Sequence, residues 1–152
     1  MHISGERRLA APPEKVWQAM HDVAVLRETV PGCQELEQTA PDTFTGSAVV
    51  GVAVIKGLYR GTVRLIEERE ASFLRVTVAA QSGHAEIRGE GSLDFQANDE
   101  GTIVRYEGEA YISGPLAPVG QRLLPAASKL LTQQFFDNID MKLRGPGEQK
   151  GR

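Results

Sequence analysis

The sequence is short of the residues that bind metals or form covalent crosslinks. Its 152 residues include one cysteine, three histidines and one tryptophan. Cys33 has no partner for an internal disulfide. His2, His21 and His84 are far apart and show none of the close spacings of metal ligands. We therefore expect no metal site and a fold stabilised by an apolar core, which a chain of this length can bury.

An excess of one charge is also lacking. Lysine and arginine together number 17, aspartate and glutamate 20, and the net charge is −3. Neither sign forms a long run along the chain. Because a nucleic-acid-binding protein needs a concentrated basic face, we expect no nucleic-acid partner.

Long apolar runs are missing too. No stretch reaches the roughly 18 to 20 apolar residues that a membrane-spanning helix requires. The first residues, MHISGERRLAAPP, contain no apolar segment of the kind found in a signal peptide. These absences predict a cytoplasmic protein, and they leave room for a peripheral contact with the inner face of the membrane.

Motifs of common catalytic sites are absent as well. Residues 51–57, GVAVIKG, differ from a phosphate-binding loop because Lys56 precedes the second glycine and no Ser or Thr follows it. The sequence contains neither an HExxH nor a GxSxG motif. Cys33 is either a reactive thiol or a small buried hydrophobe, and its place in a turn favours the second. We predict neither a catalytic residue nor a covalently bound cofactor.

The first third of the chain predicts one strand and two short helices. Residues 2–9 alternate loosely, as in a strand, and the proline pair at 12–13 suits the first turn of a helix. Asp22 can cap a second short helix that ends near Leu26. A turn at 31–32 then leads into a region with another pattern.

Between residues 33 and 112, apolar and polar residues alternate with the period of a β-strand. Turn-forming stretches interrupt the alternation at APDT, EEREAS, QSG and ANDEG. In residues 85–95 one side is apolar and rich in glycine, whereas the other side is charged. This pattern predicts a meander of antiparallel strands with one solvated face and one face that another element must cover.

The last apolar segment has the period of a helix and would supply that cover. From residue 119 to 143, apolar residues recur at steps of three and four. Pro125 lies within this segment, so we expect the helix to kink or to begin afresh near Ala126. The lead before it, residues 116–124, would be either a gate over the space below or part of a static kink.

Together these elements predict an α+β fold in which a curved antiparallel sheet wraps around the final helix. Residues 1–144 are expected to form a single domain, and residues 145–152, GPGEQKGR, a flexible C-terminal tail.

Glycines occupy inward positions of the predicted sheet, where a filled core would need side chains. They are Gly46, Gly57, Gly61, Gly89, Gly91 and Gly108. They can let the sheet bend sharply or leave a cavity beneath it, and the two interpretations are compatible. The predicted ligand-binding lining of that cavity consists of Leu26, Tyr59, Val63, Val76, Val78, Ile87, Leu93, Tyr106, Leu123, Leu124, Ala127, Leu130 and Leu131.

Five strings, taken in order, carry a resemblance to a known family. They are APPEKVW, VPGC, VIKGLYRGTVRL, GEGSLDF and LLTQQFFDNI. Together they resemble the family of the carbon monoxide dehydrogenase G subunit, which belongs to the START-like, helix-grip superfamily. The resemblance runs from about residue 2 to residue 143.

The resemblance implies a helix-grip (START-like) fold: a seven-stranded antiparallel sheet around a long C-terminal helix, with two short helices after the first strand. It also implies an elongated apolar cavity between sheet and helix. Members are encoded near molybdenum hydroxylases of the carbon monoxide dehydrogenase type. They are associated with attaching those enzymes to the membrane and with handling the quinone that receives their electrons.

Three functions follow as hypotheses. The first is a non-enzymatic carrier or adaptor that binds a hydrophobic small molecule, a quinone or a lipid, and serves such a molybdenum hydroxylase, including its membrane association. The second is a helix-grip enzyme for an aromatic or polyketide-like substrate, in which Tyr59, Tyr106, His84 or Glu86 would have to converge. The third is an accessory protein that only docks. A buried tyrosine hydroxyl would bond either a backbone group or the carbonyl of a quinone.

Overall fold

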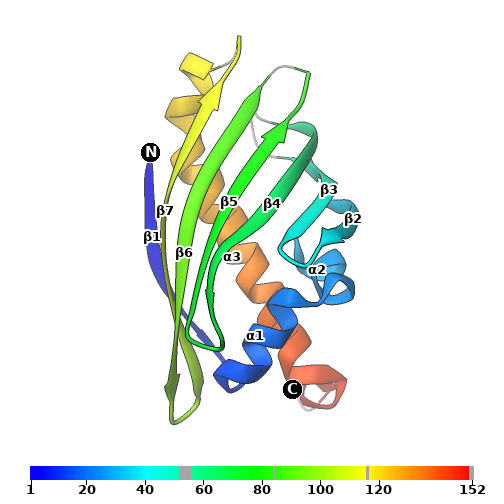
Figure 1. Cartoon of the computed structure of the whole chain (residues 1–152), viewed down its shortest axis with the longest axis vertical. Helices are drawn as coiled ribbons and strands as arrows, with labels where there is room; N and C mark the ends of the chain where they lie inside the picture. Colours follow the sequence, from blue (N-terminus) through cyan, green and yellow to red (C-terminus); the bar gives the residue numbers. More distant parts are fainter. Residues whose placement is uncertain (52–55, 84, 116, 151–152) are drawn as a thin grey trace.

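Seven antiparallel strands curve around a long C-terminal helix in the computed structural model of the chain (Figure 1). The structure describes residues 1–51, 56–83, 85–115 and 117–150. Within these ranges the elements are β1 His2–Leu9, α1 Pro13–His21, α2 Val23–Thr29, β2 Cys33–Ala40, β3 Thr43–Val50, β4 Gly57–Arg69, β5 Phe73–Gln81, β6 Glu86–Asn98, β7 Gly101–Ser113 and α3 Ala117–Lys150.

The strand order in the sheet is β1-β7-β6-β5-β4-β3-β2. Strands β2 to β7 therefore follow one another as neighbours, and the first strand closes the far edge by pairing with the last. This arrangement confirms the predicted α+β, helix-grip fold. The helices α1 and α2 lie together at one end of the molecule, and α3 crosses the concave side of the sheet (Figure 1).

The two short helices begin where the sequence indicates. Pro12 precedes α1, which begins at Pro13. The first N–H groups of a helix have no partner within the helix, so a proline there costs no hydrogen bond. Asp22 ends α1 and caps α2, because its carboxylate accepts a hydrogen bond of 2.9 Å from the backbone N–H of Ala24. α2 continues to Thr29, three residues beyond the predicted end at Leu26.

Two facing glycines mark a sharp bend in the sheet. Gly46 on β3 lies opposite Gly61 on β4. A Cβ atom on Gly46 would lie 2.1 Å from the carbonyl oxygen of Glu35, and one on Gly61 would lie 2.6 Å from that of Ala79. Both distances are far below van der Waals contact, so neighbouring backbones approach here in a way that only glycine permits.

The apolar core is divided into two clusters. The first cluster joins α1 and α2 to the adjacent end of the sheet and to the C-terminal half of α3; Val16, Val104 and Ile139 are completely buried in it. The second cluster lies towards the other end and consists of Tyr59, Ala85, Ile112, Leu124 and Ala127, with partly buried residues around them.

Polar contacts tie the C-terminal half of α3 to β1, to the loop that follows it and to α2. They are the ion pair of Arg7 with Asp137, the hydrogen bond of 3.0 Å from Ala10 N–H to Asp140 Oδ1, the hydrogen bond of 3.0 Å from Asn138 Nδ2 to the carbonyl of Thr29, and the ion pair of Glu28 with Lys142. This half of the helix is thus fixed to the scaffold.

The expected new helix start at Ala126 is wrong. α3 keeps helical backbone angles through Pro125, and the interruption lies at Gly145, with φ 77 and ψ 168. Pro125 removes the hydrogen bond to the carbonyl of Gln121, but both residues are exposed, so water can bind that carbonyl. Leu116, the first residue of the predicted lead, lies outside the described residues. Of the described helices, none is long and apolar enough to cross a membrane.

The close approach at Gly46 predicts a specific sensitivity. Gly46→Ala should lower the free energy of unfolding by about 1–3 kcal/mol, because the new methyl group must displace the backbone of β2. Urea denaturation measures this change.

Gly51→Ala is the matched control for that substitution. A Cβ atom at Gly51 would meet nothing within 4 Å, so the free energy should change by no more than about 0.5 kcal/mol. Equal stabilities of the two variants would contradict the assigned bend.

Candidate functional site

The candidate site is the space between the inner face of the sheet and α3. The strand register aligns inward residues into rows that run across the sheet. One row near the middle contains Val63, Val78, Gly89 and Ala110. The next row contains Leu65, Val76, Gly91 and Gly108. On β6 and β7 these rows carry only glycine and alanine, so this part of the sheet sends almost no side-chain volume towards the helix.

The middle row lies between the two core clusters. Val63 and Val78 face inward, yet each is only half-buried and belongs to neither cluster. Leu131 on α3 is likewise half-buried and outside both clusters. Protein interiors are close-packed. Apolar side chains that are only partly buried on the covered face of a sheet therefore indicate incomplete packing at this level, which we call the gap.

The structure places eight of the thirteen predicted lining residues in or against the two clusters and five outside them. Leu26, Val76, Leu93 and Tyr106 pack in or against the first cluster. Tyr59, Ile87, Leu124 and Ala127 belong to or pack against the second. The remaining five, Val63, Val78, Leu123, Leu130 and Leu131, are in neither cluster.

Leu130, one of the predicted lining residues, is an exposed residue of α3. Its side chain is 43% exposed, whereas Ala127 is 1% exposed. Consecutive helical residues point about 100° apart, and Leu131 takes the more buried direction at this level of α3. Ala110 and Ile112 on β7 also lie in or against the second cluster, and neither was among the predicted lining residues.

The N-terminal half of α3 is held differently from the C-terminal half. Leu124 and Ala127 are buried in the second cluster, and a Cβ atom on Gly120 would lie 2.7 Å from Ile112 Cδ1. Between described residues, the side-chain hydrogen bonds and ion pairs that join α3 to other elements all lie at residues 137–142. The helix beside the gap is therefore fixed by apolar contacts that can separate without leaving polar groups unpaired.

The two inward tyrosines are placed apart. The ring of Tyr106 stacks on Phe136 with centroids 5.5 Å apart, and its hydroxyl lies over Gly5, where a Cβ atom would be 2.3 Å away. Tyr59 is 6% exposed and lies in the second cluster. Two groups that belong to different clusters do not form one reaction centre.

The other residues that the enzyme hypothesis needs do not join the tyrosines. Glu86 lies on the outer face and accepts a hydrogen bond of 2.8 Å from Arg88, and His84 lies outside the described residues. Burial raises the pKa of the Cys33 thiol, with Arg27 acting in the opposite direction, so this thiol is not activated. Within the described ranges, no three or more His, Cys, Asp or Glu side chains are grouped as metal ligands.

The chain is similar to several bacterial proteins of known structure. A conserved protein from Geobacillus kaustophilus is 28% identical, with a TM-score of 0.89 and coverage of 95% of each chain. A protein from Chromobacterium violaceum is 18% identical, with a TM-score of 0.73, over 95% of this chain and 99% of the other. A protein from Mycobacterium smegmatis is 17% identical, with a TM-score of 0.66, over 91% and 88%. The last two likenesses show the fold alone.

Among curated proteins, none matches the chain. The model of a protein family does match, and the family is described as the G subunit of carbon monoxide dehydrogenase, CoxG. The match covers residues 5–144, which is the whole sheet apart from the first three residues of β1, both short helices and α3 as far as Arg144. The resemblance inferred from the sequence is confirmed: this chain belongs to the CoxG family of carbon monoxide dehydrogenase.

Proposed function

We propose that the protein is a non-enzymatic carrier that binds a quinone or a lipid between the sheet and α3. In this role it serves a molybdenum hydroxylase of the carbon monoxide dehydrogenase type, including the contact of that enzyme with the membrane. The family supports an accessory role for carbon monoxide dehydrogenase. The finer statement is supported mainly by one observation, the half-buried apolar residues Val63, Val78 and Leu131 between two well-packed clusters.

The energetics suit an exchangeable apolar ligand. Burial of a few hundred Å² of apolar surface at roughly 25 cal/mol per Å² gives a gross driving force on the order of 10 kcal/mol. The free-energy cost of lost translational and conformational freedom offsets much of this driving force. The ligand would bind well enough to be carried and weakly enough to be released, and no catalytic group is required.

Ligand exchange is expected beside the N-terminal half of α3. The apolar contacts of Leu124 and Ala127 hold this half, and Pro125 supplies no N–H to the helix. Local opening there costs less free energy than opening of the C-terminal half, where ion pairs and hydrogen bonds would also break.

We also propose a weak, reversible membrane contact at the end of the molecule away from α1 and α2. Val119 in the first turn of α3 is 44% exposed, and Leu58 at the start of β4 is 45% exposed. Exposed apolar residues of this kind favour contact with a lipid surface, and a single small patch does not anchor a protein stably.

Filling the gap should weaken ligand binding. Val78→Phe would place a ring in the middle row, and each 1.4 kcal/mol of lost burial, about 55 Å², lowers affinity tenfold. We expect at least about a tenfold loss of affinity for the quinone analogue decylubiquinone in isothermal titration calorimetry. The control is Thr77→Phe, which adds the same ring one residue away on the outer face. If both variants bind as the wild type does, the ligand lies elsewhere.

Hydrogen exchange tests the place of ligand exchange. Amides of residues 117–124 should exchange faster than those of residues 126–143, and decylubiquinone should slow the first group selectively. The measurement is exchange followed by mass spectrometry, with and without the quinone. Equal protection of residues 117–124 in both conditions would contradict opening at this end and leave a static helix.

Flotation with liposomes tests the membrane contact. Val119→Glu should reduce the fraction of protein that floats with vesicles at low salt, because a charge in the patch opposes insertion. Ile66→Glu, at a residue that is 48% exposed on the far part of β4, is the matched control. Loss of flotation in both variants, or in neither, would argue against a contact at the N-terminal end of α3.

A further inference from the structure

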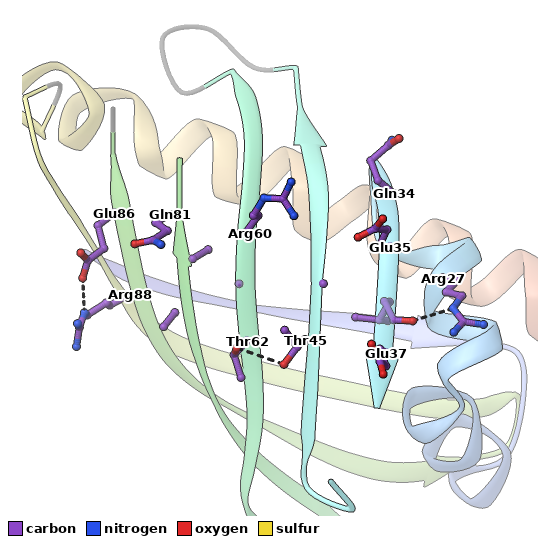
Figure 2. A pocket seen from close by; sticks show the side chains of 15 residues that line it. Arg27, Gln34, Glu35, Glu37, Thr45, Arg60, Thr62, Gln81, Glu86 and Arg88 are labelled. Atoms are coloured by element: carbon purple, nitrogen blue, oxygen red, sulfur yellow. Dashed lines mark hydrogen bonds and ion pairs between the residues drawn. The ribbon is translucent and has the colours of Figure 1, made fainter. Parts of the chain in front are cut away.

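A trough crosses the outer face of the sheet, on the side away from α3 (Figure 2). Its volume is about 1040 Å³, and its walls come from strands β2 to β6 and from Arg27 on α2. A second hollow of about 650 Å³ continues towards β7 and shares Thr62, Ala79 and Arg88 with the first. The two hollows are therefore parts of one depression.

The floor of the trough carries small side chains. Thr45, Thr62 and Ala79 are aligned across β3, β4 and β5 by the strand register. The hydroxyl oxygens of the two threonines are 3.4 Å apart, so they lie flat along the sheet. Longer side chains stand on either side of this row (Figure 2).

Two arginines rise from this floor among uncharged neighbours. Arg60 and Arg64 stand two residues to either side of Thr62 on β4. The outward residues paired with Arg60 are Ser47 and Gln81, and those paired with Arg64 are Thr43 and Thr77. No described acidic side chain forms an ion pair with either arginine.

The carboxylates on the β6 side of the trough are already engaged. Glu86 forms an ion pair of 2.8 Å with Arg88, and Glu90 lies 3.7 Å from Arg75. They are two strands from β4, which corresponds to roughly 10 Å. The guanidinium groups on β4 therefore remain available to an external anion.

The opposite wall carries negative charge. Glu35 and Glu37 lie on β2, and Figure 2 shows them beside Arg27, whose Nε donates a hydrogen bond of 2.8 Å to the carbonyl of Leu36. A bound chain would thus meet a positive axis along β4 and a negative wall along β2.

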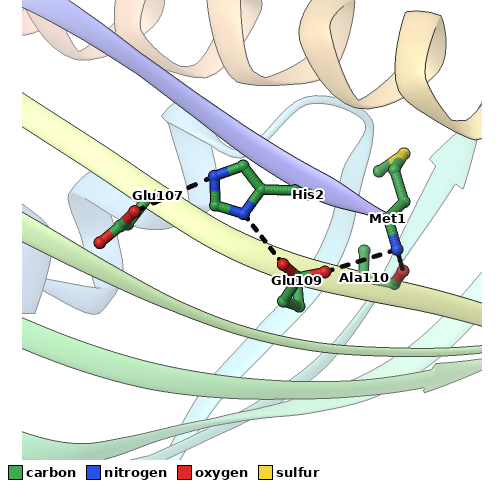
Figure 3. Close-up of polar contacts among 5 residues, drawn as sticks. All are labelled: Met1, His2, Glu107, Glu109 and Ala110. Carbon is green, nitrogen blue, oxygen red and sulfur yellow. Dashed lines mark hydrogen bonds and ion pairs between the residues drawn. The ribbon is translucent and has the colours of Figure 1, made fainter.

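At the edge of the outer face formed by β1 and β7, the charged groups contact one another. There the N-terminal amine donates to the carbonyl of Ala110 at 2.9 Å and lies 3.5 Å from Glu109 (Figure 3). His2 contacts the same carboxylate at 2.9 Å and Glu107 at 3.9 Å. The hydrogen bond from His2, with a smaller effect of the amine, holds the pKa of Glu109 below its usual value. The amine and Glu109 form an ion pair, so the attraction for an anion is centred on β4.

We propose that this trough is a docking surface for an acidic, extended segment of a partner protein. Arg60 and Arg64 are four residues apart on one strand, about 13 Å. In an extended segment, acidic residues at positions i and i+4 have the same spacing, and carboxylates form paired hydrogen bonds with guanidinium groups. Tyr111 is 61% exposed beside Arg88 and adds an aromatic contact of the kind enriched in interfaces.

This docking surface is independent of the ligand site, because it lies on the opposite face of the sheet. An extended acidic chain needs neither a quinone nor an opening of α3 to bind there. Failure of the carrier proposal would leave the docking proposal in place, and the reverse also holds.

The experiment uses fluorescence anisotropy with a labelled peptide of alternating Glu and Thr, about 12 residues long. Binding should weaken as salt is added. The double variant Arg60→Gln/Arg64→Gln should lose about tenfold or more in affinity. The double variant Arg8→Gln/Arg122→Gln removes the same charge at exposed residues away from the trough and should bind nearly as the wild type does.

Two further variants separate a docking surface from a general electrostatic field. Ala79→Trp fills the floor without changing the charge and should also lose binding. Glu35→Gln/Glu37→Gln removes the negative wall and should strengthen it. Circular dichroism verifies the fold of each variant. The residues changed within the trough, Glu35, Glu37, Arg60, Arg64 and Ala79, are all exposed on strands.

Three results would overturn the proposal. One is an equal loss of peptide affinity in both arginine double variants, which would mean that binding depends only on the net charge of the protein. Another is unchanged peptide binding by Ala79→Trp. The third is absence of peptide binding while vesicles containing phosphatidylglycerol bind the wild type and not the Arg60→Gln/Arg64→Gln variant, which would assign the surface to lipid headgroups.

Discussion

The structure depends on the close approach of backbones at the inward glycines of the sheet. At Gly46 and Gly61 neighbouring strands come within distances that no other residue tolerates, and Gly91 faces Gly108 across β6 and β7. The sheet bends where side chains are absent, and the same absence removes the volume that would fill the concave side. The close approaches support the first interpretation of the inward glycines, a sharply bent sheet, and the cavity beneath it stays a prediction.

The rest of the molecule compensates for this gap. The first cluster, built around Val16, Val104 and Ile139, packs tightly enough to stabilise the domain from one end. Polar contacts fix the C-terminal half of α3 to that end, whereas apolar contacts hold the half beside the gap. Stability and the proposed ligand exchange are thereby separated along one helix, so a ligand can leave without unfolding the scaffold.

Much of the fold could be predicted because the direction of a strand side chain depends only on alternation along the sequence. That is why residues 85–95 indicated the correct inner face. The pairing of Gly46 with Gly61 could not be predicted in this way, since it depends on hairpin register. Helical periodicity likewise fits Leu130 and Leu131 equally well as residues that face the sheet, and only the packing of α3 shows which of them is the more buried. The outer trough was missed because of register too: its floor consists of residues from three strands.

The central claim is that the space between the sheet and α3 holds an apolar small molecule. Native mass spectrometry of the purified protein, followed by analysis of its organic extract, tests it directly. The account predicts a bound quinone or lipid in stoichiometric amount, released when the protein unfolds and absent from the Val78→Phe variant. A wild-type protein that has the mass of the chain alone, and that also takes up no quinone from lipid vesicles, would contradict it.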